Sequence, residues 1–154
     1  MYAPLLSRPI LLVEDSAEDA RVTMRAFLRA GLRNAVVVCR DGEEALDYLY
    51  QQGSYAMLGK ADRPELILLD LNLPGRDGRT LLRLIKADDT IKAIPVIILT
   101  TSDEPSDIEA CYQYGANSYV KKPVDFAGFM QAIARLVDFW FTIALLPQGH
   151  ENHA

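Results

Sequence analysis

Short apolar runs, separated by longer stretches with apolar residues at helical spacing, set the pattern of this chain. Each run is rich in Val, Ile or Leu and too short for a stable helix, which predicts strands buried on both faces. The five runs are Ile10–Val13, Ala35–Val38, Leu66–Leu69, Val96–Leu99 and a weaker one at Ser118–Lys121. Five strands that alternate with five helices predict parallel βαβ units, hence an α/β fold with an open, doubly wound sheet.

Start and stop signals mark the first two helical stretches. Ser16-x-x-Asp19 resembles a capping box and opens the first helix, which Gly31 ends, and Asp41-x-x-Glu44 opens the second. Apolar spacing predicts that the first helix turns one face toward the core. That face contains Ala20, Thr23, Met24, Phe27 and Leu28.

The last helix carries more apolar surface than one packed face requires. From Asp125 onward, one stripe is expected to face the sheet: Phe126, Phe129, Met130, Ile133, Leu136, Val137, Trp140, Phe141 and Ala144. A second apolar row lies off this stripe: Ala132, Phe139, Ile143 and Leu146. Exposed aromatic patches are typical of partner surfaces, so we predict a homodimer with contacts at Phe139, Trp140, Ile143 and Leu146. The alternative is a longer core packing of the same helix.

Length and composition narrow the class of protein. With 154 residues, half of them apolar, the chain fits one domain, predicted to span residues 1–147 and to end in an extended helix. The polar segment 148–154 is predicted to be a disordered tail, with His150 and His153 as a weak metal-ligand pair. A net charge of −5 with scattered Lys and Arg argues against direct nucleic-acid binding.

Two further features favour a cytoplasmic location. The N-terminal residues lack the apolar stretch of a signal peptide, and no uninterrupted apolar run reaches the length of a membrane span, so no membrane partner is expected. Cys39 and Cys111 have neither metal-ligand spacing nor neighbouring histidines. We interpret both as small buried hydrophobic residues in a reducing compartment.

Polar residues that follow the apolar runs form one candidate site. Ligands of open parallel sheets bind outside the carboxyl ends of the strands, where this chain has Glu14, Asp15, Asp70, Thr100 and Lys122. Three carboxylates at one edge repel one another unless a cation neutralises them, and Mg²⁺ prefers such oxygen ligands. The ammonium and the hydroxyl suit a phosphoryl group. Each residue alone is more simply a turn former, a helix cap or an exposed cation, so the prediction depends on their conjunction.

These residues lie in motifs that resemble the receiver domains of bacterial two-component response regulators. The motifs are VEDS at 13–16, LLDLNLPGRDG at 68–78, LTTS at 99–102, GA at 115–116 and YVKKP at 119–123. The resemblance implies a flavodoxin-like five-stranded parallel sheet of order 2-1-3-4-5 with five helices. It makes Asp70 the phosphoacceptor, with Mg²⁺ bound by Asp15, Asp70 and the backbone carbonyl of Asn72, and by Glu14 through water. Such a chain accepts its phosphoryl group from a histidine kinase and is not an enzyme, although it assists its own phosphorylation.

The same resemblance assigns the conformational switch. Thr100 and Tyr119 are its switch pair, Lys122 contacts the phosphoryl group, and the bond before Pro123 is expected to be cis. Without the motif, Tyr119 is equally well interpreted as a half-buried strand aromatic. Glu14 stands where many receivers have Asp, and its extra methylene still permits a water-mediated metal contact.

Two segments resemble a narrower group, the response regulators of bacterial phytochrome histidine kinases. One is the long connection 51–64, predicted to be a surface loop, and the other is the apolar segment 138–147. This resemblance implies a phytochrome-type kinase as partner and output through protein–protein interaction.

Two other functions compete with this prediction. A phosphatase of the haloacid dehalogenase type also uses an aspartyl nucleophile, Mg²⁺ and a lysine, but its DxDx[TV] motif is absent because Asn72 stands two residues after Asp70. A constitutive interaction module that has lost phosphorylation would not need the expected site residues, all of which this chain has.

Overall fold

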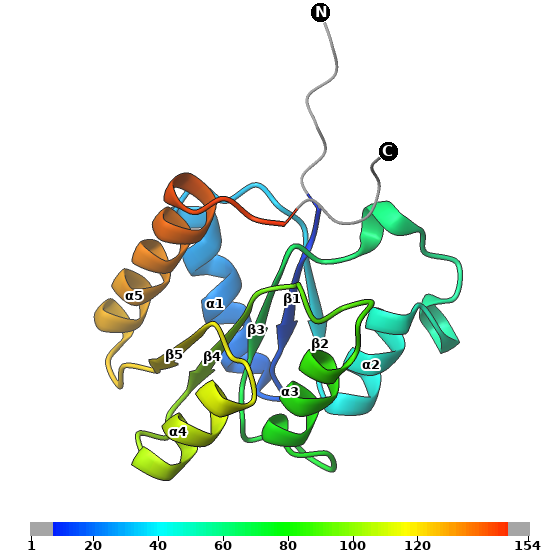
Figure 1. Cartoon of the computed structure of the whole chain (residues 1–154). Helices are drawn as coiled ribbons and strands as arrows, with labels where there is room; N and C mark the ends of the chain where they lie inside the picture. Colours follow the sequence, from blue (N-terminus) through cyan, green and yellow to red (C-terminus); the bar gives the residue numbers. More distant parts are fainter. Residues whose placement is uncertain (1–7, 148–154) are drawn as a thin grey trace, which may run out of the picture.

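The fold is a five-stranded parallel sheet between two layers of helices, in a computed structural model that describes residues 8–147 (Figure 1). The strand order is β2-β1-β3-β4-β5, so the predicted flavodoxin-like fold is confirmed. The strands are β1 Ile10–Val13, β2 Val36–Cys39, β3 Leu66–Leu69, β4 Val96–Thr100 and β5 Ser118–Lys121. The helices are α1 Ala17–Arg29, α2 Gly42–Tyr50, α3 Gly78–Ala87, α4 Pro105–Gln113 and α5 Phe126–Asp138.

Both faces of the sheet are covered, which explains why the strands appear in the sequence as uninterrupted apolar runs. Leu11 and Val13 of β1 pack in the core formed with α2, α3 and α4. Their neighbours Ile10 and Leu12 point to the opposite core, formed with α1 and α5. In the central strands β1 and β3, side chains therefore alternate between two cores, and every position is apolar and buried.

The start of α3 lies directly against the end of β3. Gly78 donates its N–H to the carbonyl of Leu71 at 3.1 Å. A Cβ atom at residue 78 would lie 2.5 Å from the carbonyl oxygen of Asp70 and 2.6 Å from the Cα of Leu71. Only glycine allows this close approach, which fixes the helix beside the polar residues that follow β3.

Helical spacing overstated the buried faces of two helices. Leu28 is 75% exposed and Met24 lies partly in solvent, because only part of the apolar stripe of α1 reaches the core. Phe126 is half exposed at the first residue of α5, before the helix meets the sheet. Strand β2 lies one residue later than predicted, since Ile10 pairs with Val36.

The connection after α2 contains two short 3₁₀ helices, η1 Gly53–Tyr55 and η2 Lys60–Asp62, where the sequence predicted a surface loop. Tyr55 packs against Tyr48 of α2 with its ring edge-on, and Tyr48 donates its hydroxyl proton to the carbonyl of Asp62. The connection is therefore fastened to α2 at both of its 3₁₀ turns.

Helix α5 continues into the π-helical segment η3, Phe139–Ile143. By length and composition the whole stretch Phe126–Ile143 could cross a membrane. In the fold, one face of this stretch contributes Phe129, Ile133 and Val137 to the core, while most of its other residues are not buried. The predicted disordered tail 148–154, with His150 and His153, lies outside the described residues.

Candidate functional site

Three carboxylates meet at the carboxyl ends of β1 and β3. The backbone N–H of Glu14 donates to the carbonyl of Cys39 at 2.9 Å, and that of Asp70 to Val13 at 3.1 Å, so the sheet ladder continues one residue past each strand. Ligand atoms of Glu14, Asp15 and Asp70 lie within 4.8 Å of one another. Glu14 and Asp70 are buried and Asp15 is exposed, which gives the cluster one side open to solvent.

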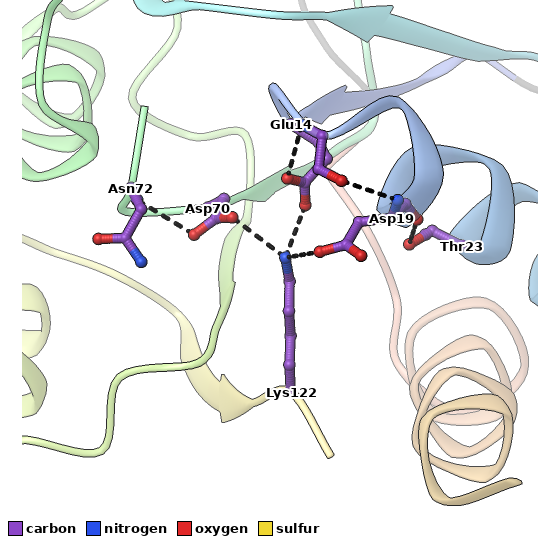
Figure 2. A network of polar contacts seen from close by, with 7 residues as sticks. Glu14, Asp19, Thr23, Asp70, Asn72 and Lys122 are labelled. Carbon is purple, nitrogen blue, oxygen red and sulfur yellow. Dashed lines mark hydrogen bonds and ion pairs between the residues drawn. The ribbon is translucent and has the colours of Figure 1, made fainter. Parts of the chain in front are cut away.

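Lys122 reaches this cluster from the residue after β5. Its backbone N–H donates to the carbonyl of Thr100 at 2.6 Å, which aligns it with the end of β4. Its Nζ lies 2.8 Å from Glu14, 2.9 Å from Asp19 and 3.1 Å from Asp70 (Figure 2). Four of the five strand-end residues expected from the sequence therefore converge through their side chains, Thr100 joins them through its backbone, and α1 adds a carboxylate.

Burial and charge perturb the two most buried of these groups. Burial raises the pKa of the Glu14 carboxyl to about 7, although the Lys122 ammonium opposes the shift. Burial alone would lower the pKa of Lys122, but hydrogen bonds to Glu14 and Asp19 and the charge of Asp70 bring it above its usual value. Lys122 therefore stays charged at neutral pH, and a single ammonium faces several acidic groups.

The donor set fits a hard divalent cation. Every donor offered by Glu14, Asp15 and Asp70 is a carboxylate oxygen, which Mg²⁺ and Mn²⁺ accept readily. The backbone N–H of Asn72 donates to Asp70 Oδ1 at 3.1 Å and holds that carboxylate in place. A divalent ion would remove the excess negative charge that one lysine leaves uncompensated.

Thr100 and Tyr119 lie on neighbouring strands beside the cluster. Thr100 is fully buried, and its hydroxyl has no hydrogen-bond partner among residues 8–147. Tyr119 packs partly against the core and donates its hydroxyl proton to the carbonyl of Ser102 at 2.9 Å. The end of β4 therefore carries the buried, unpaired hydroxyl of Thr100. The hydroxyl of Tyr119, on β5, is hydrogen-bonded to the loop that follows β4.

The prediction of a cis bond before Pro123 is wrong in this structure. All peptide bonds in residues 8–147 are trans. Trans is the lower-energy isomer, by about 0.5–1 kcal/mol for a bond before proline. Lys122 contacts three carboxylates from the trans geometry, so its position does not require the cis isomer.

Asp19 is the residue that the sequence did not reveal as part of the site. Its backbone N–H donates to Ser16 Oγ at 3.1 Å, as expected of a capping box. In a complete box its carboxylate would accept the N–H of Ser16, but Glu14 accepts that proton instead at 3.2 Å. The carboxylate of Asp19 is therefore free to pair with Lys122, and only its place one turn after the acidic pair hinted at this.

Comparison with known proteins decides the family. A profile described as the response regulator receiver domain matches residues 10–134. The chain belongs to the response regulator receiver family. Response regulator Rcp1 of Synechocystis sp. is 38% identical to this receiver over 138 residues, which cover 90% of this chain and 92% of Rcp1.

Solved structures agree with this receiver over most of its length. The phosphorylated cyanobacterial phytochrome response regulator RcpA is 42% identical, with a TM-score of 0.85 over 92% of this chain and 99% of RcpA. The Mn²⁺-bound form of Rcp1 is 38% identical, with a TM-score of 0.85 over 91% of this chain and 99% of that structure. The receiver is thus a response regulator of phosphorelay signalling, close to those of phytochrome systems.

Proposed function

We propose that Asp70 accepts a phosphoryl group from a histidine kinase. The observation that carries this proposal is the buried ion pair between Lys122 and Asp70 within the acidic cluster, 3.1 Å from Nζ to Oδ2. The chain assists its own phosphorylation and is not a turnover enzyme. Release of inorganic phosphate beyond one equivalent from a phosphomonoester would instead favour the phosphatase alternative.

Each residue of the cluster has a separate proposed role in phosphoryl transfer. An oxygen of Asp70 forms the new bond to phosphorus as the bond from phosphorus to the histidine nitrogen breaks. The Lys122 ammonium stabilises negative charge on the phosphoryl oxygens. Asp15, Asp70 and the backbone carbonyl of Asn72 would hold Mg²⁺, with Glu14 acting through water. When bound, Mg²⁺ neutralises charge on the phosphoryl oxygens.

The proposed switch uses the unpaired hydroxyl of Thr100. A phosphoryl group on Asp70 supplies strong acceptor oxygens, to which this hydroxyl can donate. Movement of Thr100 would leave space for Tyr119 to give up its bond to Ser102 and turn inward. The surface formed by β4, β5 and their adjoining helices would then repack and carry the output through protein–protein contact.

Replacement of the nucleophile tests the assignment directly. The Asp70→Asn variant should take up no phosphoryl group from a phosphohistidine donor or a small phosphodonor, as measured by intact-protein mass. Asp103→Asn is a matched control, because Asp103 is an exposed acid that pairs with Lys121 outside the cluster. Equal labelling of both variants would reject Asp70 as the phosphoacceptor.

The kinase partner is proposed to be of the phytochrome type, in the cytoplasm. This rests on the similarity to Rcp1 and RcpA, the second described as a phytochrome response regulator. A phosphotransfer profile against several purified histidine kinases should show the fastest transfer from a phytochrome-type kinase. Preference for a kinase of another class would contradict the pairing.

We also propose that the chain forms a homodimer through the end of α5, and that direct nucleic-acid and membrane binding play no part. Phe139 is half exposed and Ile143 is 63% exposed, Leu146 is half-buried, and Trp140 packs partly against the core. Sedimentation at micromolar concentration should show a dimer for the wild type and a monomer for Ile143→Asp. Met57→Asp, at an apolar residue that is 96% exposed and far along the chain, should remain dimeric.

A further inference from the structure

The Lys122 ammonium is saturated in this structure. A lysine ammonium has three N–H donors, and three carboxylates surround this one at 2.8, 2.9 and 3.1 Å (Figure 2). On phosphorylation the negative charge of Asp70 moves onto the phosphoryl oxygens, and the N–H that now faces Asp70 can follow it. A second N–H of Lys122 can meet a phosphoryl oxygen only if the bond to Glu14 or to Asp19 is given up.

Burial decides which bond is given up at least cost. The side chain of Glu14 is 3% exposed, so it would lose its partner without gaining water in exchange. The side chain of Asp19 is 46% exposed, and water can replace the ammonium there. Asp19 is also free of the capping role that would hold its carboxylate elsewhere, because Glu14 accepts the N–H of Ser16.

Asp19 also borders a cleft that reaches Lys122. Together with Glu18, Lys122 and Phe126, it lines a cleft of about 410 Å³ between the start of α1 and the connection from β5 to α5. The carboxylate therefore lies between solvent and the ammonium that the phosphoryl group needs. Glu18 lines the same cleft, but its carboxylate makes no ion pair with Lys122.

We propose that Asp19 is a positioning residue that holds Lys122 in the unphosphorylated state and competes with the phosphoryl group for its ammonium. The inference rests on the proposed role of Asp70. By this competition Asp19 lowers the affinity of the site for a phosphoryl group and shifts the balance toward the unphosphorylated form. Removal of its charge should free one N–H of Lys122 for the phosphoryl oxygens.

The test measures binding of beryllium fluoride, a phosphoryl mimic, in the presence of Mg²⁺ by fluorine NMR. Asp19→Asn should bind the mimic about three- to tenfold more tightly than the wild type, as expected for loss of one partly exposed, charge-assisted competitor. Asp19→Glu, which keeps the carboxylate, should return within about twofold of the wild type on the same reasoning.

Glu18→Gln separates direct competition from simple repulsion of anions. It removes the same charge from the same cleft, so repulsion alone would make both variants tighter by similar factors, and high salt would screen both gains. We expect a change below about twofold for Glu18→Gln, and a gain for Asp19→Asn that persists at high salt. Equal gains in the two variants, or weaker binding by Asp19→Asn, would overturn the inference. Failure of the wild type itself to bind the mimic or to be labelled at Asp70 would instead overturn the proposed function.

Discussion

Replacement of Thr100 by valine should stabilise the unphosphorylated protein. The Thr100 side chain is fully buried, and its hydroxyl finds no partner within residues 8–147. An unsatisfied buried hydroxyl costs about 1–3 kcal/mol, and valine has nearly the same shape without the polar atom. We therefore expect Thr100→Val to raise the free energy of unfolding by about 1–2 kcal/mol.

This gain in stability is large enough to be measured by thermal and urea unfolding. For a chain of 154 residues, an unfolding entropy of about 2.1 cal/mol/K per residue converts 1–2 kcal/mol into a rise in Tm of about 3–6 °C. Thr100→Ser is the matched control, because it keeps the hydroxyl and removes the buried methyl group. It should lower stability by about 1 kcal/mol.

The same variant separates labelling from switching. Thr100→Val should still be phosphorylated at Asp70, since Thr100 contributes no atom to the bond that forms. Its conformational response, followed by NMR of the β4 and β5 amides, should be blunted. A valine variant less stable than the wild type would refute the reasoning, because it would mean that the hydroxyl is well bonded in the unphosphorylated protein.

Three other predictions follow from the site and the core. Lys122→Met should lower the free energy of unfolding by roughly 3–5 kcal/mol, because buried carboxylates lose their partner. Mg²⁺ should restore part of this loss, and urea titration with and without the ion tests both statements. Mg²⁺ at about 100 times its Kd should raise the free energy of unfolding of the wild type by about 2.7 kcal/mol, and that of Asp15→Asn by much less. A chelator should abolish the gain in both proteins. An equal gain in Asp15→Asn would contradict the metal site. Burial raises the pKa of Cys39 to about 12 and of Cys111 to about 11, so fewer thiolates form at pH 8. Neither residue should therefore react with iodoacetamide until urea is added. Rapid alkylation of the native protein, measured by intact-protein mass, would argue against this.

Much of the fold could be predicted because its central strands are buried on both faces. Three of the five strands, β1, β3 and β5, begin and end at the predicted residues. For β1 and β3 the apolar run ends where the sheet edge meets water, whereas β5 is a half-buried edge strand with a weaker pattern. The same rule placed Glu14, Asp70 and Lys122 at one edge, and they lie together in the structure.

The errors arise where local pattern does not specify tertiary contact. Leu28 has the spacing of a core residue, yet it lies on the solvent side of α1. Asp19 has the spacing of a capping residue, but its carboxylate pairs with a lysine 103 residues away in sequence. The isomer before Pro123 depends on the same long-range geometry, and a short motif does not determine it.

The contact of Gly78 with the Asp70 backbone divides the site into a rigid half and a movable half. Because α3 begins in van der Waals contact with the residue that would carry the phosphoryl group, this helix and the end of β3 must shift together or not at all. Mechanical freedom is left to the opposite side, where Thr100 and Tyr119 lie. A fluorophore attached to α3 should therefore respond weakly to phosphorylation, whereas one attached to the loop after β4 should respond strongly.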